Sequence, residues 1–432
     1  MTQKTKLIDR ILGKKAEAAQ GAALASPVPI VSKVSKDFTR FDRFPGYEKM
    51  LVPKAAAERF GLANPFFVSH DGLAGATTQI DGREFINFSS YNYLGLNGDP
   101  RVNQAAKNAI DLYGTTVSAS RLVAGERPIQ RDLERALAQV YGVEDCVAFV
   151  SGHATNVSTI GYLFGPKDLV LHDALAHNSI IEGIKLSGAT RRSFAHNDTA
   201  QLDQILADIR GQFERVLIVI EGHYSMDGDI PDLPAFIDIK RRHQAFLMVD
   251  EAHSLGVLGT TGLGLHEHYG VPGTDVDIWM GTLSKTMAGC GGYIAGERAL
   301  VEHLKYAAPG FVYSVGLAPA LAAAALQCLE ILHQEPQRVH QLRQITQYLL
   351  TEAKKAGLDI GLSQGFSIVP VIVGSSLKAV KLSNALFKAG INIQPIIHPA
   401  VEEKAARLRF FLSNQHTPAH IDTTIAAICR SL

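Results

Sequence analysis

Between residues 100 and 300, short apolar runs alternate with longer segments whose apolar residues recur at helical spacing. Short apolar runs indicate buried strands, and their alternation with helices is typical of a largely parallel sheet with helices on both faces. The pattern therefore predicts a large α/β domain. Its expected helices span 101–113, 128–142 and 199–212, and its expected strands span Cys146–Val150, Leu169–Leu171, Val216–Ile220, Phe246–Val249 and Ile278–Met280.

Two shorter regions flank this domain. Before it, Asp71-Gly72 and Asp81-Gly82 break apolar runs between Phe66 and Asn87, which favours short strands joined by hairpin turns. After it, the pattern predicts a smaller α+β domain, with a buried Ala-rich helix at 317–333, an amphipathic helix at 337–356 and strands at Ser367–Val373 and Leu408–Leu412. We expect an N-terminal arm with short strands at 1–75, a large domain at 76–315 and a small C-terminal domain at 316–432.

The N-terminal region has a different composition. Residues 1–35 are rich in Ala, Lys and Ser and contain a Pro-Val-Pro break, which predicts a tail or short helix outside the core. An aromatic and basic segment at Phe38–Tyr47 follows. We expect it to pack on the body or on another subunit; a docking surface for a carrier domain is the alternative.

Composition narrows the class of function. The 432 residues carry 42 basic and 42 acidic side chains, so no net charge favours nucleic acid or an anionic membrane. The four cysteines are widely spaced without a Cys-x-x-Cys pair, which argues against a disulfide framework or a metal site. The chain shows neither an apolar run of about 20 residues nor the apolar core of a signal peptide at its start. We expect a cytoplasmic protein.

The strongest chemical signal is a carboxylate and an amine at two strand ends. Asp250 closes the run at 246–249, and Lys285 follows the run at 276–280 across a turn of small residues. Ligands of open α/β sheets bind outside the carboxyl ends of the strands. Pyridoxal phosphate (PLP) needs such a pair, because the Lys forms a Schiff base and the Asp keeps a proton on the pyridine nitrogen. Each residue alone could be a solvated surface group, but together they favour a PLP site.

A phosphate cradle is expected next to this pair. Ser151 and Gly152 follow a strand and open a helix, whose first amides can bind an anion, and Gly152 lets the backbone come close. Thr282 lies three residues before Lys285 and could add a hydroxyl.

Two histidines and a serine are candidates for contacts with the cofactor ring. His177 could lie flat on the ring, although a structural role is the alternative. His253, three residues beyond Asp250, could donate to the phenolic oxygen, and Ser225 is a second candidate for that oxygen.

Arg407 and Arg409 alternate with Leu408 on a predicted C-terminal strand, so both should face one side. A guanidinium beside a PLP pocket can hold an amino-acid carboxylate through two hydrogen bonds. Solvated arginines on an edge strand are the alternative.

Ordered motifs add a family resemblance. From about Phe66 to the C-terminus the chain resembles the α-oxoamine synthases, PLP enzymes of fold type I. The motifs are Ser90-Tyr-Asn92-Tyr-Leu-Gly-Leu, Ala119-Ser-Arg-Leu-Val-Ala-Gly, Ser151-Gly-His-Ala-Thr-Asn, His177-Asn-Ser, His196-Asn-Asp, Glu221-Gly-His-Tyr-Ser-Met-Asp-Gly-Asp, Val249-Asp-Glu-Ala-His-Ser-Leu-Gly, Gly281-Thr-Leu-Ser-Lys, Tyr313-Ser314 and Arg407-Leu-Arg-Phe.

The resemblance implies roles for single residues. It makes Lys285 the Schiff-base lysine, Asp250 the pyridinium partner and His177 the residue that stacks on the ring, while His253 and Ser225 would bond the phenolic oxygen. The phosphate would be contacted by Gly152, His153 and Thr282. Asn92 would line the substrate pocket, and Arg409, rather than Arg407, would bind the substrate carboxylate. Ser314 matches a phosphate contact supplied by the neighbouring subunit, which implies a homodimer with shared sites.

The resemblance also implies the reaction. It is a decarboxylative condensation of a small α-amino acid with an acyl thioester of coenzyme A or a carrier protein, giving an α-aminoketone, CO2 and free thiol. The alternatives are an aminotransferase or retro-aldol lyase, or a non-catalytic partner subunit, although such a subunit typically lacks the lysine present here.

Three positions differ from the family or from one of its branches, and two of them bear on the substrate. Ser120 stands where the glycine-restricted branch has Thr, which favours an amino acid larger than glycine, and His398 stands near the place where the serine-using branch has an arginine, which favours alanine. Gln130 stands where many relatives have His.

Overall fold

The computed structural model describes residues 34–47, 49–51 and 61–432, which form two units divided after Gly61. In the first unit, 3-10 helices span Lys36–Thr39 (η1) and Phe41–Arg43 (η2). The Phe38 and Phe41 side chains there are 72% and 87% exposed. Both interpretations of this segment, packing arm and docking surface, stay predictions, and the tail predicted at 1–35 lies outside the described residues except for its last two.

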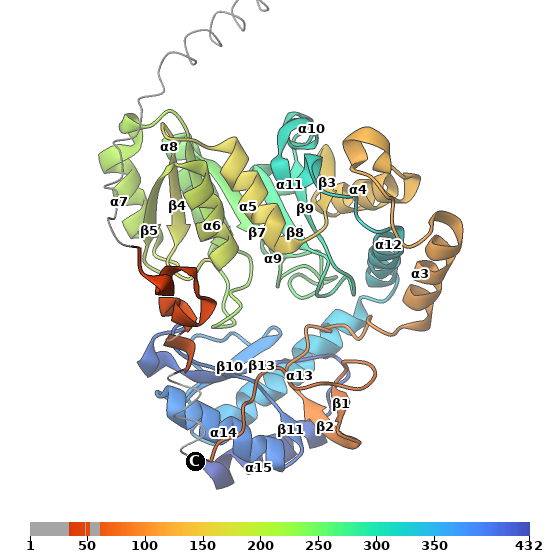
Figure 1. Cartoon of the computed structure of the whole chain (residues 1–432), viewed down its shortest axis with the longest axis vertical. Coiled ribbons are helices and arrows are strands. Elements are labelled where there is room, and N and C mark those ends of the chain that lie inside the picture. The colour runs from red at the N-terminus through yellow and green to blue at the C-terminus, as the bar shows by residue number, and fades with distance from the viewer. Residues whose placement is uncertain (1–33, 48, 52–60) are drawn as a thin grey trace, which may run out of the picture. The chain divides into compact units, whose positions relative to one another are not determined.

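A seven-stranded sheet forms the core of residues 62–432. In spatial order its strands are β3 (Asp145–Phe149), β9 (Gly292–Gly296), β8 (Ile278–Thr282), β7 (Phe246–Asp250), β6 (Val216–Glu221), β4 (Leu169–Asp173) and β5 (Thr190–Phe194) (Figure 1). Strand β9 runs antiparallel to both of its neighbours, and the other strands run parallel to one another. The predicted, largely parallel α/β sheet is confirmed.

Helices cover both faces of this sheet. Along β6, Leu217 and Val219 belong to one buried cluster, whereas Ile218 and Ile220 belong to another, as expected when successive side chains of a strand point to opposite faces. The first cluster packs against α5 (Gly152–Leu163), α6 (Asn178–Ser187), α10 (Arg298–Ala307) and α11 (Pro309–Val312). The second packs against α4 (Pro128–Tyr141), α7 (Thr199–Ile209), α8 (Leu233–His243), α9 (Leu265–Tyr269) and α12 (Pro319–Gln334), and α3 (Pro100–Tyr113) packs on α12.

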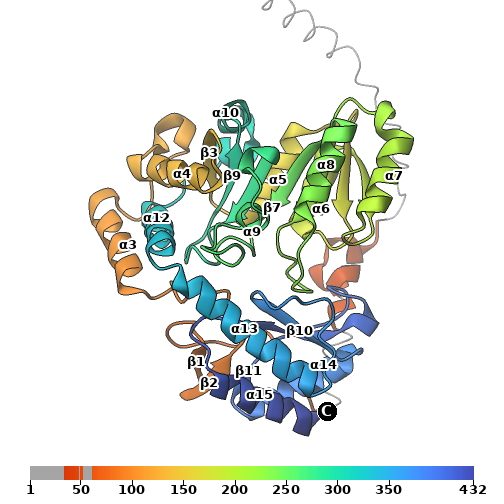
Figure 2. The same ribbon diagram turned by 180° about the vertical axis from the view of Figure 1, so that it is seen from behind.

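Two small sheets lie apart from the large one, together with α13 (Gln337–Lys355), α14 (Ser376–Lys388) and α15 (Pro418–Ser431) (Figures 1 and 2). One contains β10 (Ile368–Ile372), β13 (Arg407–Phe411) and β12 (Pro395–Ile396), all antiparallel. The other contains the hairpin β1 (Thr77–Ile80) and β2 (Arg83–Asn87), with β11 (Ile391–Asn392) parallel to β2.

This pairing bears on the predicted domain division, which stays a prediction. Residues 76–87 were expected to open the large domain, but their hairpin joins β11 of the C-terminal region. The turn at Asp81-Gly82 is present, with positive φ at both residues, as a tight two-residue hairpin requires. No hairpin forms around Asp71-Gly72, where Asp71 makes only an isolated bridge with Gln79.

Candidate active site

A cavity of about 280 Å³ opens at the carboxyl ends of the central strands, where the sequence predicted a ligand. Strands β6, β7 and β8 each contribute their last residue, which are Glu221, Asp250 and Thr282. The start of α5 forms another wall. The other lining residues are Ser151, Gly152, His153, Asn156, His177, Ser179, Ser225, Ala252, His253, Met280, Ser284, Lys285, Cys290 and Gly291.

Asp250 is buried and held by two hydrogen bonds. Its Oδ1 accepts from the Ala252 amide at 3.0 Å, and its Oδ2 accepts from Asn156 Nδ2 at 2.8 Å. These neutral donors fix the carboxylate without cancelling its charge. Asp250 can therefore supply a negative charge in the cavity, for which a protonated ring nitrogen is a suitable partner.

His177 is tied to the same carboxylate through two side chains. As the N-cap of α6, it accepts at Nδ1 from the Ser179 amide, 3.3 Å away, and the Ser179 hydroxyl lies 2.7 Å from that nitrogen. Asn156 Nδ2 donates to Ser179 Oγ at 2.9 Å. Burial lowers the pKa of His177, although Asp250 acts in the opposite direction, so the ring is neutral and its orientation is fixed.

The opposite end of the cavity has the features of an anion cradle. Ser151 caps α5 by accepting from the Ala154 amide at 3.3 Å. A Cβ at Gly152 would lie 2.7 Å from Thr282 Oγ1, so only glycine fits at this approach of helix to strand. The hydroxyls of Thr282 and Ser284 lie 2.7 Å apart beside it, and together with the α5 amides they can hold a phosphate.

Lys285 lies between these groups, 5.6 Å from the centre of the Tyr91 ring. Burial lowers the pKa of Lys285 to about 8, although the neighbouring Asp250 and Glu221 act in the opposite direction. A much larger fraction of the amine than in a free lysine, although still a minority, is therefore neutral near physiological pH, and the neutral amine is the nucleophilic form.

His253 closes one side of the cavity. Its ring stacks on Phe411, with centroids 6.1 Å apart and planes 7° from parallel, and its Nδ1 lies 2.7 Å from the Tyr93 hydroxyl. Burial lowers the pKa of His253 well below its usual value, and the positive charge of Lys285 adds to this effect. His253 is therefore neutral.

The two arginines of β13 face the same side, as the alternation predicts, and both reach the loop that carries Ser225. Arg407 is buried and pairs with Asp227 at 2.6 Å. Arg409 Nη1 donates to the Ser225 carbonyl at 3.1 Å, with Met226 Sδ at the same distance, while its buried Nε has no partner. Neither is a solvated edge-strand residue. Arg409 keeps free donor capacity, whereas Arg407 is already neutralised.

Five of the predicted residues are not among those that line this cavity: Arg407 and Arg409, and also Asn92, Ser120 and Ser314. Asn92 lines a neighbouring cavity of about 590 Å³, which shares Ser284, Lys285 and Cys290 with the first. Its amide already bonds the Ala74 and Asn97 carbonyls and the Asn97 amide. Ser120 and Ser314 lie outside the residues that line either cavity.

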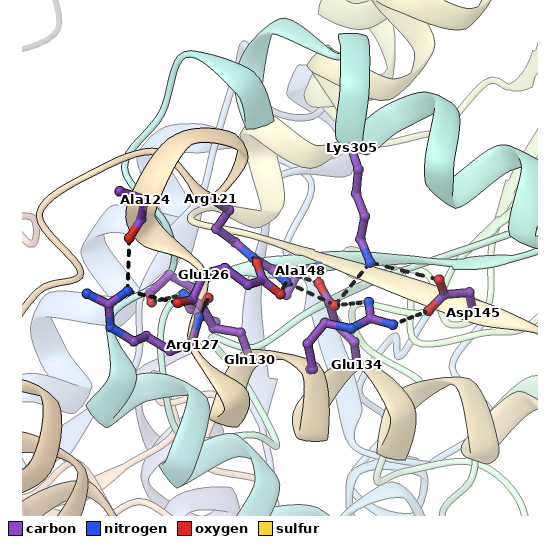
Figure 3. A network of polar contacts seen from close by, with 11 residues as sticks. Arg121, Ala124, Glu126, Arg127, Gln130, Glu134, Asp145, Ala148 and Lys305 are labelled. Carbon is purple, nitrogen blue, oxygen red and sulfur yellow. Dashed lines mark hydrogen bonds and ion pairs between the residues drawn. The ribbon is translucent and has the colours of Figure 1, made fainter.

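The segments that carry Ser120 and Ser314 are joined to each other. The Gly316 amide donates to the Ala119 carbonyl at 3.0 Å, and Gln130 Nε2 donates to the Leu317 carbonyl at 2.8 Å. Below them, buried Arg121 pairs with Glu126 and Glu134, and Glu134 also contacts Arg131 and Lys305 (Figure 3). Within this network, the glutamine that departs from the family pattern links the two segments.

Sequence reasoning missed Asn156, Ser179, Glu221 and Tyr93. Asn156 lies four residues after Gly152 in α5, and the helical period would have placed both on one face. Glu221 is adjacent to Asp250 in the sheet register. Burial, followed by the charge of Asp250, raises the pKa of Glu221 well above its usual value, which favours the protonated form of Glu221.

These features fit PLP. The α5 cradle suits its phosphate, Asp250 suits its ring nitrogen, the His177 side chain suits its ring face, and the Lys285 amine suits its aldehyde. Among residues 34–47, 49–51 and 61–432, no cluster of His, Cys, Asp or Glu could hold a metal ion. Every helix in the described part of the chain is too short or too polar to cross a lipid bilayer.

Comparison with known proteins agrees with this chemistry. Residues 83–428 match the family described as Aminotransferase class I and II. The chain is 41% identical over 351 residues to an 8-amino-7-oxononanoate synthase of Symbiobacterium thermophilum, covering 81% of this chain and 89% of that protein. It is 36% identical to a 4-hydroxy-2,2'-bipyrrole-5-methanol synthase of a Serratia species, covering 81% of this chain and 53% of that protein.

Solved structures show the same relationship. The serine palmitoyltransferase of Sphingomonas wittichii superposes with a TM-score of 0.85 and 28% identity, covering 90% of this chain and 97% of that one. The 8-amino-7-oxononanoate synthase of Francisella tularensis superposes with a TM-score of 0.70 and 26% identity, covering 80% and 97%. The chain therefore belongs to the aminotransferase class I and II family and, within it, to the α-oxoamine synthases, PLP-dependent acyltransferases of fold type I.

Proposed function

We propose that the decarboxylative condensation catalysed by this enzyme takes a small α-amino acid whose carboxylate is held by Arg409. The observation that carries this proposal is a half-buried guanidinium whose Nε is fully buried and has no hydrogen-bond partner among the described residues. Burying a cation without an anion is costly. An incoming carboxylate would relieve that cost and form hydrogen bonds assisted by charge.

The other residues would divide the work as follows. Bound PLP supplies an electron sink for the bond that breaks at the amino acid's Cα. Lys285 would attach the cofactor and then remove the Cα proton, because its lowered pKa makes the unprotonated amine more accessible than in a free lysine. Asp250 would keep the ring nitrogen protonated, His177 would lie against the ring, and His253 and Ser225 would hold its phenolic oxygen.

We propose that the amino acid is larger than glycine, with alanine favoured over serine. Support comes from Ser120, which is smaller than the Thr of the glycine-restricted branch, and from His398 in place of an arginine. Because Ser120 does not line the cavity of its own chain, its influence requires a second subunit.

We propose that two copies of the chain share their sites. Ser314, as a phosphate contact, would then enter the partner's cavity rather than its own. The segments around it carry exposed apolar side chains, including Val123 and Tyr313, which are 82% and 86% exposed. Segments that are held by buried ion pairs and that expose apolar side chains are typical of a subunit interface.

The acyl thioester would approach through the neighbouring cavity of about 590 Å³, since it reaches Lys285 from the side of Tyr91 and Asn92. The thiol would belong to coenzyme A or to an acyl-carrier protein. A cytoplasmic location is also proposed, and the four free cysteines of the described chain fit a reducing compartment.

One experiment tests the proposed function. The enzyme loaded with PLP is titrated with glycine, alanine and serine while the absorption of the cofactor is followed, and each bound amino acid is then offered acyl thioesters of coenzyme A and of a carrier protein. We expect CO2 and free thiol in equal amounts. Transfer of the amino group without CO2 release would contradict the condensation and favour an aminotransferase.

A further inference from the structure

Tyr93 makes a contact with His253 that the proposed chemistry does not yet use. Its side chain is fully buried and does not line the cavity. Its hydroxyl lies 2.7 Å from His253 Nδ1. His253 lines the cavity, and its Nε2 makes no hydrogen bond with the described residues. The ring therefore offers one edge to Tyr93 and leaves the other nitrogen for a ligand.

Two aromatic neighbours restrict how this ring can turn. Phe411 stacks on its face, and Tyr91 meets it edge-on, with centroids 6.0 Å apart and planes at 80°. Stacking fixes the plane of an imidazole but leaves its rotation within that plane free. The Tyr93 hydroxyl removes this freedom, because a rotated ring would lose its hydrogen bond.

The proton between the two residues has one favourable arrangement. Burial raises the pKa of Tyr93 well above its usual value and lowers that of His253, so both side chains are neutral. If Nδ1 carried the proton, the Tyr93 hydroxyl would accept it and would then need another acceptor for its own proton. The Ser367 hydroxyl is the alternative acceptor: it is near enough to act on the pKa of Tyr93 in the lowering direction, but it makes no hydrogen bond with any described residue. A buried hydroxyl without an acceptor is unfavourable.

We infer that Tyr93 is a positioning residue that donates to Nδ1 of His253 and thereby keeps the histidine proton on Nε2, which faces the cavity. His253 then presents an N–H donor where the phenolic oxygen of PLP is expected. With the proton on Nδ1, Nε2 would instead present a lone pair to an anionic oxygen, which is repulsive. The inference rests on the proposed role of His253 toward that oxygen.

The Tyr93→Phe variant of the enzyme loaded with PLP tests the inference, because it removes only the hydroxyl. An ionised phenolic oxygen absorbs at longer wavelength than a protonated one, so we expect the long-wavelength band to lose intensity to the short-wavelength band. The expected change in their ratio is roughly 2- to 12-fold, which corresponds to the loss of about 0.5–1.5 kcal/mol from one hydrogen bond. Tyr141→Phe is the matched control, because Tyr141 is buried, bonds the Tyr293 hydroxyl at 2.6 Å and does not line the cavity.

Two further variants separate the possible failures. If His253→Ala leaves the bands unchanged, the proposed role of His253 is wrong. If His253→Ala shifts them and Tyr93→Phe does not, only the inference about Tyr93 fails. Ser367→Ala should be silent, and a shift equal to that of Tyr93→Phe would mean that Tyr93 donates to Ser367 instead. In the variant that combines Tyr93→Phe with His253→Ala, the ratio of the two bands should equal that of His253→Ala alone.

A direct measurement covers the case in which Tyr93→Phe does not fold. Nitrogen NMR of the parent holoenzyme containing 15N-histidine reports which ring nitrogen carries the proton, and a His253→Gln variant assigns the signal. We expect a protonated Nε2 and an unprotonated Nδ1. The reverse pattern would overturn the inference.

Discussion

Arg409 offers the sharpest test of how the substrate is held. Its guanidinium bonds a backbone carbonyl and a thioether and lies 4.4 Å from the centre of the Phe411 ring, and its buried Nε has no acceptor among the described residues. Burial lowers the pKa of Arg409, which is the mark of a buried cation without a carboxylate partner. Arg409→Gln would remove this cation and leave the surrounding protein groups satisfied.

The size of the effect follows from the bond that is lost. A hydrogen bond to a charged group contributes about 1.5–3 kcal/mol, and a factor of ten corresponds to about 1.4 kcal/mol. The dissociation constant of the amino acid should therefore rise roughly 12- to 140-fold. The affinity for PLP should stay the same, since Arg409 does not line the cofactor cavity.

The assay is a titration with alanine, followed through the absorption of the bound cofactor. Arg407→Gln is the matched control on the same strand. Because it leaves Asp227 buried without its partner, we expect it to lower stability by about 3–5 kcal/mol and to change amino-acid affinity much less. Weaker binding in Arg407→Gln than in Arg409→Gln would refute the assignment of the carboxylate site.

Four other predictions follow from described contacts. Lys285→Ala should bind PLP without a covalent link and lose turnover by several orders of magnitude. In the parent apoprotein, covalent attachment of PLP should increase as pH rises through about 8. Borohydride labelling of another lysine would contradict the role of Lys285. Asp250→Asn should keep the fold and bind the amino acid but lose condensation, as stopped-flow absorption would show; near-normal turnover would exclude the carboxylate's role. Burial alone would lower the pKa of His196, but Asp173 and Asp229 raise it to about 10. In denaturant unfolding near pH 6, His196→Gln should therefore lower the free energy of unfolding by about 3–5 kcal/mol, and this difference from the parent protein should shrink as pH rises through 10. Ser120→Thr should shift kcat/KM from alanine toward glycine by about 1–3 kcal/mol, and an unchanged preference would remove Ser120 from the pocket.

The sequence was sufficient to place candidate site residues that directly follow a clear apolar strand. Asp250, Thr282 and Lys285 could be placed because apolar runs precede them and parallel strands end at one edge. Strand β9 was not predicted, because glycines bound it and its antiparallel direction breaks the alternation. Polar β5 was missed for a related reason, since an edge strand with exposed Thr190 and Arg191 has no apolar run.

Local sequence patterns could not predict contacts between segments that are distant in the chain. Tyr93 and His253 are 160 residues apart, and Asn156 and Asp250 are 94 residues apart. The pairing of β2 with β11 likewise joins residues separated by about 300 positions. Periodicity indicates which side of an element is buried, but it does not identify the side chain across the interface.

The placement of Arg409 has an evolutionary consequence. It lies on β13, in a small sheet, whereas Asp250, Thr282 and Glu221 end strands of the large sheet. If Arg409 holds the substrate as proposed, mutations in β13 around it can alter how the amino acid is bound without changing the residues that end the strands of the large sheet. Such a modular arrangement lets a lineage diversify its products in small steps, and it marks the residues of β13 beside Arg409 as the segment to randomise when new amino-acid specificities are sought in the laboratory.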